Sequence, residues 1–534
     1  MLVLDYIYKN RLFLEYIKRR GFIMRIILAA RSINEFVIGK IERGEKVDPS
    51  ELTPESAPAG FARVSRDPRS VTELREEAAK DVSAARKSNK AIFYGMGHHS
   101  IAEHGILSFD VMEVSRLAIE ALELHRIGVA YTEKSQRYIT LNGDYLIPKD
   151  LPQGLSEEFN DNIKRQNGLY HRSIPELLEF HKKENQGLSK IADEKKAKGI
   201  QDKFNSEKNI LEGKAKEDAR YIVSMATLGQ LGFSCNIREL EYIITHLRHH
   251  PLMEVQEMSK TFYKIGSEVA PSLIIYSDAE AFEKEFGKSL ENRFQKEFDF
   301  DLKKVCAELG HISLQNFRGD DVELLSYSRD GDKKIMAALL SRGLGINNKD
   351  AHSYISTLSL DEARKFLLDS FKELTEFDRM PREFELATYT FKIITTATEF
   401  AQLKRHRMMT LLPEPYDPNL GFTLPESVIE SGLKQEFKDE IDKASGLFYK
   451  IKEYNSSVAE YALTNAHRRE NIVKMNLREL YAVSRLREDG HAQWEIRNHA
   501  HKMSELAREV TPLTAMFLGG KDQFKEIKRK LYHG

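Results

Sequence analysis

The chain contains 534 residues, of which 41% are hydrophobic, and its 81 Lys and Arg residues nearly balance its 82 Asp and Glu residues. This length is more than one ordinary hydrophobic core can organise, so the sequence predicts two substantial domains. The charge balance excludes an overall field that would draw the whole protein to nucleic acid or to an anionic membrane, so any function that needs positive charge must be local.

The N-terminal residues are apolar with basic interruptions, and the strand-like stretch MRIILAA begins at Met24. Residues 1–23 lack an uninterrupted apolar core followed by a small-residue cleavage site, so we interpret them as an appended helix or an artefact of start-site choice. No run approaches the roughly 20 apolar residues that cross a bilayer, so no membrane association is expected. The two cysteines, Cys235 and Cys306, lie far apart, which excludes a disulfide framework and suits the cytoplasm.

Two charged segments divide the rest of the chain. Residues 181–219 are dense in Lys and Glu and almost without large apolar residues, which predicts a solvated helical arm. Residues 283–305 are also charged and predict a linker helix. The expected organisation is a first domain at 24–282 that carries the arm as an insertion, the linker at 283–305, and a second domain at 306–534.

The two domains share four short sequence matches in the same order. The pairs are RVSRDPRS (63–70) with SYSRDGDK (326–333), AEHGILSFDV (102–111) with FELATYTFKI (384–393), LHRIG (124–128) with RHRMM (405–409), and CNIRELEYIITHLR (235–248) with MNLRELYAVSRLR (475–487). A single match could arise by chance, because unrelated helices often contain similar short sequences. Four matches in the same order indicate a tandem duplication. The second pair alternates apolar and polar residues as a half-buried strand does. Each copy is therefore predicted to combine strands with longer helices, which is the α+β class.

Side chains rather than a glycine-rich loop must hold any phosphate, because the sequence has neither a dinucleotide-binding fingerprint nor a P-loop. Arginine suits this role because its guanidinium is always charged and can donate two parallel hydrogen bonds to phosphate oxygens. Arg137, Arg405 and Arg407 are the first candidates. For any one of them, the alternative is a surface arginine paired with a nearby glutamate.

The histidines and cysteines do not predict a metal or thiol site. His98 and His104 in GHHSIAEH (97–104) lack the i,i+4 spacing of helical metal ligands, so a polar pocket or packed histidines are expected there. HLRHHP (246–251) is interpreted in the same way. Cys235 has no adjacent base that would make it a nucleophile, so it is expected to be a small buried residue.

Together these words resemble the flavin-dependent thymidylate synthase (ThyX) family, whose hallmark is Arg-His-Arg followed, after a spacer, by Ser-x-Arg. Copy one keeps Ser135 and Arg137 of this hallmark but has Leu124 in place of the first arginine. Copy two keeps the whole triplet 405–407 but has Pro-Tyr-Asp at 415–417 in place of Ser-x-Arg. The losses are complementary, and the resemblance implies two tandem ThyX-like α/β domains, each a mixed sheet packed with long helices.

The resemblance assigns site roles residue by residue. The residues implied to contact FAD are Ser65, His98, Ser100, Glu103, Arg405, His406, Arg407 and Asn476. The residues implied to contact dUMP are Gln402, Glu133, Ser135, Arg137, Arg220 and Arg487, of which Arg487 is implied to be catalytic together with Arg405. Copy one has Arg248 at the expected equivalent of Arg487, and copy two has Glu460 at that of Arg220. Copy two also has RMPREFEL (379–386) in place of the flavin segment GHHSIAEH.

The activity implied by the resemblance is reductive methylation of dUMP to dTMP. Methylenetetrahydrofolate would supply the carbon, FAD would relay the hydride and NADPH would reduce the flavin. Each active site would draw on both copies, and a homodimer of double chains would replace the family's four-subunit assembly, with half of its sites inactive. Two alternatives remain: a decayed homologue that binds flavin or nucleotide without turnover, and, as an outsider, a His/Glu metal hydrolase.

Overall fold

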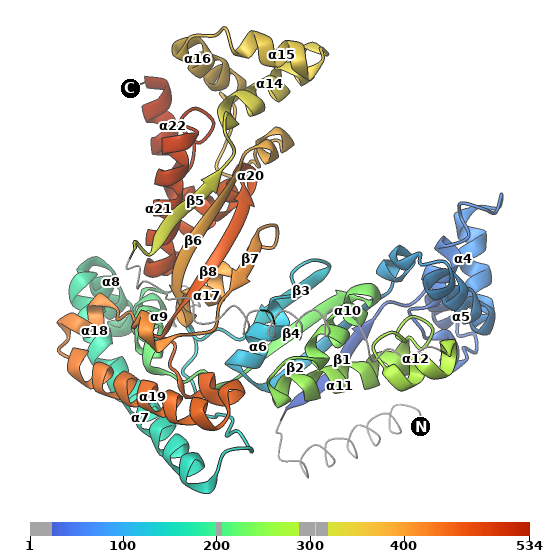
Figure 1. Cartoon of the computed structure of the whole chain (residues 1–534), viewed down its shortest axis with the longest axis horizontal. Helices are drawn as coiled ribbons and strands as arrows, with labels where there is room; N and C mark the ends of the chain where they lie inside the picture. Colours follow the sequence, from blue (N-terminus) through green and yellow to red (C-terminus); the bar gives the residue numbers. More distant parts are fainter. Residues whose placement is uncertain (1–23, 199–205, 288–304, 306–318, 534) are drawn as a thin grey trace. The chain divides into compact units, whose positions relative to one another are not determined.

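The structure, a computed structural model, describes residues 24–198, 206–287, 305 and 319–533. Within them the chain divides into two compact units (Figure 1). The first unit consists of the described residues within Met1–Ala219, Val223–Gln315 and Asp442–Ala462. The second unit consists of the described residues within Arg220–Ile222, Asn316–Ile441 and Leu463–Gly534. Each unit is built mainly from one sequence copy and receives one segment from the other. The appended helix predicted at 1–23 and most of the linker predicted at 283–305 lie outside the described residues.

The first unit is organised around a four-stranded sheet with the strand order β1-β2-β4-β3. Its strands are β1 (Arg25–Arg31), β2 (Ile106–Ser115), β3 (Val129–Glu133) and β4 (Leu228–Asn236). Alternate residues of β2 and β4 are buried, and their Phe109 and Phe233 meet Phe262 of α11 (Met253–Val269) edge-on, with ring centroids 5.1 and 5.5 Å apart. Helix α10 (Ile237–Arg248) lies beside α11 along this sheet (Figure 1).

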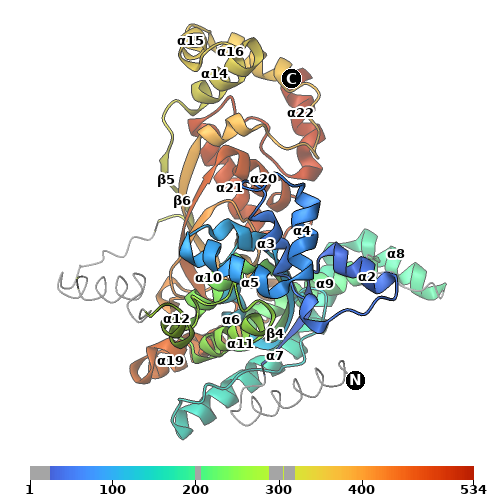
Figure 2. The same ribbon diagram turned by 90° about the vertical axis from the view of Figure 1, so that its right-hand side faces the viewer.

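The other helices of the first unit connect these strands, except α12, which follows α11. Helices α3, α4 and α5 pack as one group in the β1–β2 connection (Figure 2). The bounds are α2 (Glu35–Glu42), α3 (Ser56–Phe61), α4 (Val71–Lys80), α5 (Val82–Lys90), α6 (Arg116–Glu123), α7 (Gln153–Glu184), α8 (Gln186–Ala197), α9 (Glu207–Ala219) and α12 (Ala279–Phe286). Helix α19 (Lys434–Tyr454) begins in the second unit and continues into the first.

The second unit repeats this plan with the strand order β5-β6-β8-β7. Its strands are β5 (Val322–Tyr327), β6 (Thr388–Thr396), β7 (Thr410–Pro413) and β8 (Arg468–Asn476). Helices α14, α15 and α16 belong to the segment of chain that connects β5 to β6, and they form a separate group (Figure 1). The helix bounds are α14 (Gly331–Leu344), α15 (Asn348–Ile355), α16 (Leu360–Ser370), α17 (Ala397–Leu403), α18 (Glu426–Glu430), α20 (Leu477–Arg487), α21 (Trp494–Val510) and α22 (Phe524–His533).

The predicted α+β class is confirmed, with one difference in the sheets. All neighbouring strands are antiparallel in both units, whereas the prediction was a mixed sheet. Parallel neighbours need a connection of a dozen or more residues, and several connections here are that long. Connection length therefore allowed either direction, and the sequence pattern could not discriminate between them.

Three of the four sequence matches fall on equivalent elements. The strand match lies on β2 and β6, and the matches at LHRIG and RHRMM follow α6 and α17. The fourth pair spans β4 into α10 and β8 into α20, where Asn236 and Asn476 each accept the backbone N–H of the third helical residue. Asparagine favours this N-cap position because its side chain satisfies an otherwise unpaired donor.

The remaining match, between 63–70 and 326–333, is wrong. Residues 326–333 include the end of β5, and β5 is equivalent to β1 because each pairs with the next strand of its sheet. Ser32 and Ser328 are therefore the equivalent serines: their backbone N–H groups both donate across to the following strand, to Ile106 and Thr388, at 2.9 Å. The short word Ser-Arg-Asp occurs in both copies, but strand pairing puts it at different places in the fold.

The described parts of the charged segment, 181–198 and 206–219, are mostly helical, but only some of them are solvated. Helix α8 has no buried residue, as a solvated arm requires. Helix α9 instead packs on α7 and buries Leu211, Gly213 and Ala215. The small residues allow the two helices to approach closely, which overrides the charged composition. Among the described residues, no helix combines the length and the hydropathy needed to cross a membrane.

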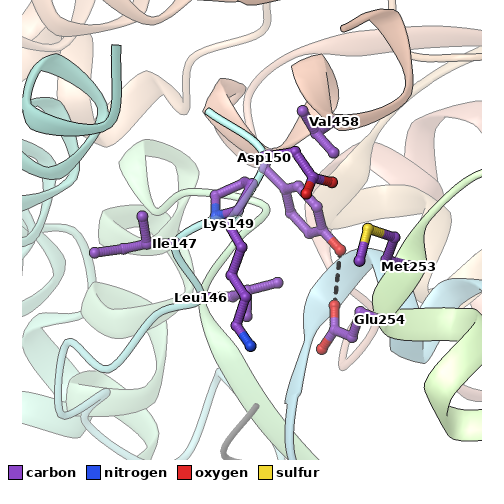
Figure 3. A pocket seen from close by; sticks show the side chains of 9 residues that line it. Leu146, Ile147, Lys149, Asp150, Met253, Glu254 and Val458 are labelled. Atoms are coloured by element: carbon purple, nitrogen blue, oxygen red, sulfur yellow. Dashed lines mark hydrogen bonds between the residues drawn. The ribbon is translucent and has the colours of Figure 1, made fainter. Parts of the chain in front are cut away.

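A buried glutamate begins α11 and its equivalent α21. In the first unit Glu254 accepts hydrogen bonds from the N–H (2.7 Å) and hydroxyl (2.5 Å) of Ser115 and from the Tyr461 hydroxyl (2.8 Å). Figure 3 shows Glu254 beside Met253, with this last hydrogen bond dashed, in the pocket that Lys149 also lines. Burial raises the pKa of Glu254, and the hydrogen bonds oppose that shift.

The second unit has the same arrangement, with its tyrosine taken from the first sequence copy. Glu495 accepts from the hydroxyls of Thr396 (2.5 Å) and Tyr221 (2.9 Å). Tyr221 belongs to the second unit although copy one supplies it, and Tyr461 belongs to the first unit although copy two supplies it. The two copies therefore exchange one tyrosine each, and each tyrosine satisfies a buried carboxylate.

We expect Tyr461→Phe to lower the free energy of unfolding by about 1–3 kcal/mol, because it leaves the buried Glu254 carboxylate short of a donor. Tyr354 is 57% exposed, so Tyr354→Phe is a matched control that should change stability by less than about 0.5 kcal/mol. Urea denaturation followed by fluorescence measures both. Equal stabilities of the two variants would contradict the role given to this hydrogen bond.

Candidate functional site

The end of α17 and the end of α20 bring three predicted residues of the second unit together. The Arg487 guanidinium donates through Nε to His406 Nε2 (2.9 Å) and through Nη1 to Gln402 Oε1 (3.1 Å). Its Nη2 also donates to the backbone carbonyl of Gln402 (3.2 Å). Because Arg487 only donates, His406 Nε2 must be the unprotonated ring nitrogen. His406 is buried, so the arginine is held against a neutral acceptor.

Around this cluster the chain presents donors and positive charge. Arg405 and Arg407, on either side of buried His406, are exposed. The side-chain nitrogen Nε2 of Gln402 is buried and has no hydrogen-bond partner among the described residues. An unsatisfied buried amide donor is costly, so this nitrogen is suited to a ligand carbonyl. The cluster therefore combines cations with an amide donor, which suits an anion that also has carbonyl groups.

The equivalent place in the first unit has a second histidine where the second unit has the Arg487 guanidinium. His125 donates from Nδ1 to the Leu122 carbonyl (3.2 Å), so its Nε2 accepts from His246 Nδ1 at 2.9 Å. Burial and the neighbouring His246 lower the pKa of His125 to about 4. Burial likewise lowers the pKa of His250 to about 4. His125 is therefore neutral near pH 7 and supplies no charge for an anion.

The structure corrects one equivalence between the copies. His246, not Arg248, meets the buried histidine of copy one as Arg487 does in copy two. Arg248 lies 3.8 Å from Asp278. Both arginines end similar helices, but the helix register turns Arg248 away from His125. Ala121 and Leu124 stand at the positions of Gln402 and Arg405, so copy one keeps His125 and Arg126 but has no counterpart of the Gln402 amide or the Arg405 guanidinium.

The Ser-x-Arg loop of copy one follows β3 in the first unit. Ser135 Oγ accepts the backbone N–H of Arg137 (3.0 Å), which makes a tight turn. The Arg137 guanidinium pairs with Glu217 of α9 at 2.6 Å, and the Glu217 side chain is only 7% exposed. The alternative of a glutamate-paired arginine thus applies to Arg137, although its partner is buried. Glu133 ends β3 opposite Leu231 of β4.

The corresponding loop of copy two has a different structure. Asp417 Oδ1 accepts from the backbone and side chain of Asn419, both at 2.9 Å, and so caps a short turn. Tyr416 is buried against the Arg469 guanidinium, whose central carbon lies 3.9 Å from the ring centroid. The loop therefore serves packing and turn formation, and it carries no cation.

All four predicted flavin residues of copy one line a single cavity of about 820 Å³. The cavity lies between the chain after α3, the helical turn Ala91–Gly95 and the 3₁₀ helix His99–His104. This volume is within the range of cofactor pockets. The predicted residues are Ser65, His98, Ser100 and Glu103, and the cavity is also lined by Arg63, Arg66 and Asp67.

The arginines of this cavity were not predicted to be site residues, although the quoted word FARVSRD contains both. Arg63 pairs with Glu77 at 2.9 Å, and Arg66 Nη1 lies 3.7 Å from the sulfur of Met96. Glu103 forms an ion pair with Arg238, and its equivalent Glu385 pairs with Arg478 at 2.9 Å. Because both copies keep this pair, its structural role extends beyond the cavity.

The histidines of GHHSIAEH pack as the sequence predicted. His99 and His104 pack against Phe93 and Phe61 with tilted rings, whose centroids are 4.7 and 4.6 Å apart. Within the described parts of the chain, no group of three or more His, Cys, Asp or Glu side chains could hold a metal ion. Cys235 is buried, as expected for a small apolar residue.

Two further predicted residues have defined structural surroundings. Arg220 is buried in the second unit, where its carbonyl accepts from Asn465 Nδ2 at 2.9 Å. Glu460, its counterpart in copy two, belongs to the first unit. The Asn476 side chain is the N-cap of α20, a structural role that its predicted part in cofactor binding did not include.

A protein-family comparison covers most of both units. The model described as thymidylate synthase complementing protein matches residues 50–272 and 323–513. The chain is 27% identical over 451 residues to a UPF0159 protein of Thermoplasma acidophilum, covering 80% of this chain and 87% of that protein. It is 22% identical over 454 residues to a UPF0159 protein of Chlamydia muridarum, covering 80% of each.

Other relatives match a shorter part of the chain. A flavin-dependent thymidylate synthase of Clostridium tetani is 31% identical over 240 residues, which is 44% of this chain and 87% of that protein. Nearly the whole of that synthase thus matches less than half of this chain, as a duplication predicts. A solved structure, the UMP/dUMP methylase PolB of Streptomyces cacaoi bound with 5-Br dUMP, has a TM-score of 0.31 and 17% identity, and covers 49% of this chain and 95% of that one.

We expect His125 to stay neutral from pH 8 down to about pH 5, because its pKa of about 4 lies below that range. His499, whose pKa is raised to about 9, should be protonated over the same range and lose its proton only above it. Histidine ¹³Cε1 NMR of the full chain, with signals assigned from H125Q and H499Q spectra, measures both. A His125 midpoint near 6.5 would show that the pair in copy one is not a neutral, desolvated contact.

Proposed function

Because the chain belongs to the family of thymidylate synthase complementing proteins, we propose that it is a flavin-dependent thymidylate synthase that converts dUMP to dTMP. The carbon donor is methylenetetrahydrofolate and the reductant is NADPH. The observation that carries the proposal is the single cavity that collects Ser65, His98, Ser100 and Glu103. These residues come from two sequence words that each resemble a flavin segment of the family.

The residues present in the cavity fit FAD. Its volume of about 820 Å³ is sufficient for a large cofactor. The hydroxyls of Ser65 and Ser100 and the ring of His98 are hydrogen-bonding groups, and Arg63 and Arg66 are cations suited to phosphate oxygens. When bound, FAD supplies the hydride transfer, and the protein needs only to bind and orient the reactants.

The cluster at the end of α17 fits the pyrimidine. The buried amide nitrogen of Gln402 would donate to a ring carbonyl, since it has no other partner among the described residues. The Arg487 guanidinium, held by His406 and Gln402, would stabilise negative charge that develops on the ring. Arg405 adds a second cation at the same site. No protein thiol takes part, in agreement with the burial of Cys235, which raises its pKa well above the ordinary value.

A uridylate site built from both copies explains the complementary losses. Copy two would supply Gln402, Arg405 and Arg487, and copy one would supply Glu133, Ser135, Arg137 and Arg220. Arg220 supports this proposal because it belongs to the second unit although copy one supplies it. It follows by three residues Glu217, the partner of Arg137 in the first unit.

The opposite combination of residues would not bind the nucleotide. It would join the His125 and His246 pair with Asp417 and Glu460, and carboxylates repel a phosphate. We therefore propose a homodimer of double chains with four potential sites, of which two are active.

Purified full-length protein should be yellow, should consume NADPH faster when dUMP is added, and should form dTMP when methylenetetrahydrofolate is also present. A yellow protein that forms no dTMP would identify the decayed binding homologue. A colourless protein that takes up no added FAD would contradict both readings.

Arg487→Ala should lower dTMP formation by a factor of about 10² or more, because it removes a charge that stabilises the transition state. The matched control is Arg248→Ala, which changes the sequence-equivalent arginine beside Asp278 and should keep activity within about twofold. Steady-state dTMP formation by chromatography measures both. If Arg248→Ala were the more damaging, the assignment of the active copy would be reversed.

Arg405→Ala and Arg137→Ala should each abolish turnover, although they lie in different copies, because each removes a cation from one shared site. Arg220→Ala should weaken dUMP binding about tenfold or more, whereas Glu460→Ala, at the equivalent place in copy two, should not weaken it. Isothermal titration with dUMP measures the second pair. Normal activity of either Arg405→Ala or Arg137→Ala would rule out the mixed site.

A further inference from the structure

A second carboxylate and a histidine lie beside Glu495 in the second unit. Glu399 is on the first turn of α17, its side chain is 1% exposed, and its Oε1 lies 2.9 Å from His499 Nδ1. His499 follows Glu495 by one turn of α21. The result is a buried group of two carboxylates and one imidazole that links α17 to α21.

The first unit has the shared glutamate without this pair. Glu399 and Ala118 are equivalent, because their backbone N–H groups donate to the N-cap side chains of Thr396 and Ser115. Glu254 is equivalent to Glu495, so Met258 stands one turn later where the second unit has His499. Met258 is fully buried. An apolar alanine and methionine therefore fill the same place in the copy that has no counterpart of Gln402 and Arg405.

Stability alone does not account for the charged pair. The cost of removing two charges from water offsets much of the attraction between them in a buried ion pair. Replacing such a pair with apolar residues of similar volume therefore often leaves the protein equally stable. The second oxygen of Glu399, Oε2, is buried without a hydrogen-bond partner among the described residues, which adds to that cost. The first unit demonstrates that this fold accepts an apolar pair at these positions.

The pair acts on a helix that carries the proposed site. Helix α17 has seven residues, so Glu399 in its first turn and Gln402 near its end lie one turn apart on the same side. Gln402 holds Arg487 through its side-chain and backbone oxygens. A rotation or shift of α17 would therefore move Gln402 and release the Arg487 guanidinium.

We propose that Glu399 and His499 are positioning residues that hold the first turn of α17 against α21 and thereby orient Gln402 and Arg487 for the pyrimidine. The inference rests on the proposed function for the identity of that ligand. Neither residue is a catalytic group, since both act through Gln402. The difference between the copies follows: the pair is present in the copy that keeps Gln402, Arg405 and Arg487.

The charges around the pair agree with this geometry. Burial and the charge of Glu399 raise the pKa of Glu495 to about 7. Burial lowers the pKa of His499, but the charge and hydrogen bond of Glu399 and the charges of Glu495 and Asp321 outweigh it and raise the pKa to about 9. Asp321 is paired with Arg468, and the Tyr221 hydroxyl donates to Glu495. His499 is thus cationic near pH 7 and holds Glu399 by charge as well as by a hydrogen bond.

The test is the full-length double variant E399A/H499M, which puts the residues of the first unit into the second. We expect its unfolding midpoint to stay near that of the wild type and its KM for dUMP to rise about tenfold, with kcat changed less than about threefold. E399Q, whose amide oxygen can still accept from His499, should keep its KM within about threefold of the wild type. An unchanged KM in the double variant would overturn the proposal. A raised KM together with a clearly lowered unfolding midpoint would also overturn it, because the effect would then come from general destabilisation.

A readout on Arg487 separates this inference from the proposed function. The ¹⁵N-labelled Nε–H signal of Arg487, assigned with R487K, should exchange slowly with water in the wild type and quickly in E399A/H499M. If the wild type neither binds nor converts dUMP, the proposed function fails, and this signal alone decides whether the pair positions Arg487. Equal protection in both proteins would overturn the positioning role.

The pH dependence of stability provides a further check. The pKa of His499 is raised in the folded state, so its contribution is present below about pH 6.5 and is lost as the pH rises towards about 9. The double variant lacks this group. Its stability should fall less between pH 6.5 and 9 than that of the wild type, and an equal fall in both would show that the histidine is not held by Glu399 as proposed.

Discussion

The hydrogen bonds of one buried carboxylate in each unit are the constraint on which the rest of the structure depends. Glu254 and Glu495 lie where a strand end, a helix start and an exchanged tyrosine meet. A carboxylate without donors is costly to bury, so the strand end and the tyrosine cannot move independently of the helix that carries the glutamate. Helices α6 and α17 start at these same strand ends. The placement of LHRIG and RHRMM therefore follows from the carboxylate contact.

The two units use this common frame for different electrostatics. In the second unit a guanidinium, Arg487, meets the buried histidine, and exposed arginines flank it. In the first unit His246 takes that place, and burial keeps His125 neutral near pH 7. The cavity with Ser65 and His98, in contrast, is in the first unit. The two copies also lack different parts of the sequence hallmark, which is the pattern expected when duplicated halves divide one function.

Much of the fold was predictable because its signals are local. The alternating patterns at 102–111 and 384–393 identified β2 and β6 from the sequence, although each strand begins several residues later, after a 3₁₀ helix. The wrong match of 63–70 with 326–333 arose because a three-letter identity carries less information than strand pairing. The burial of α9 was missed because its charge concealed small residues that pack against α7. Strand direction was missed because long connections permit either.

By itself, the sequence determined which side chains are available for binding an anion and where strands and helices alternate, because composition and periodicity are properties of neighbouring residues. The complementary losses of the two copies came instead from the resemblance to the ThyX hallmark. Only the tertiary structure decided that His246 rather than Arg248 meets His125, and that Tyr221 and Tyr461 are exchanged. The reason is geometric. Each residue turns an α-helix by about 100°, so a shift of one or two positions changes which side chain faces a partner, and that partner is distant in the sequence.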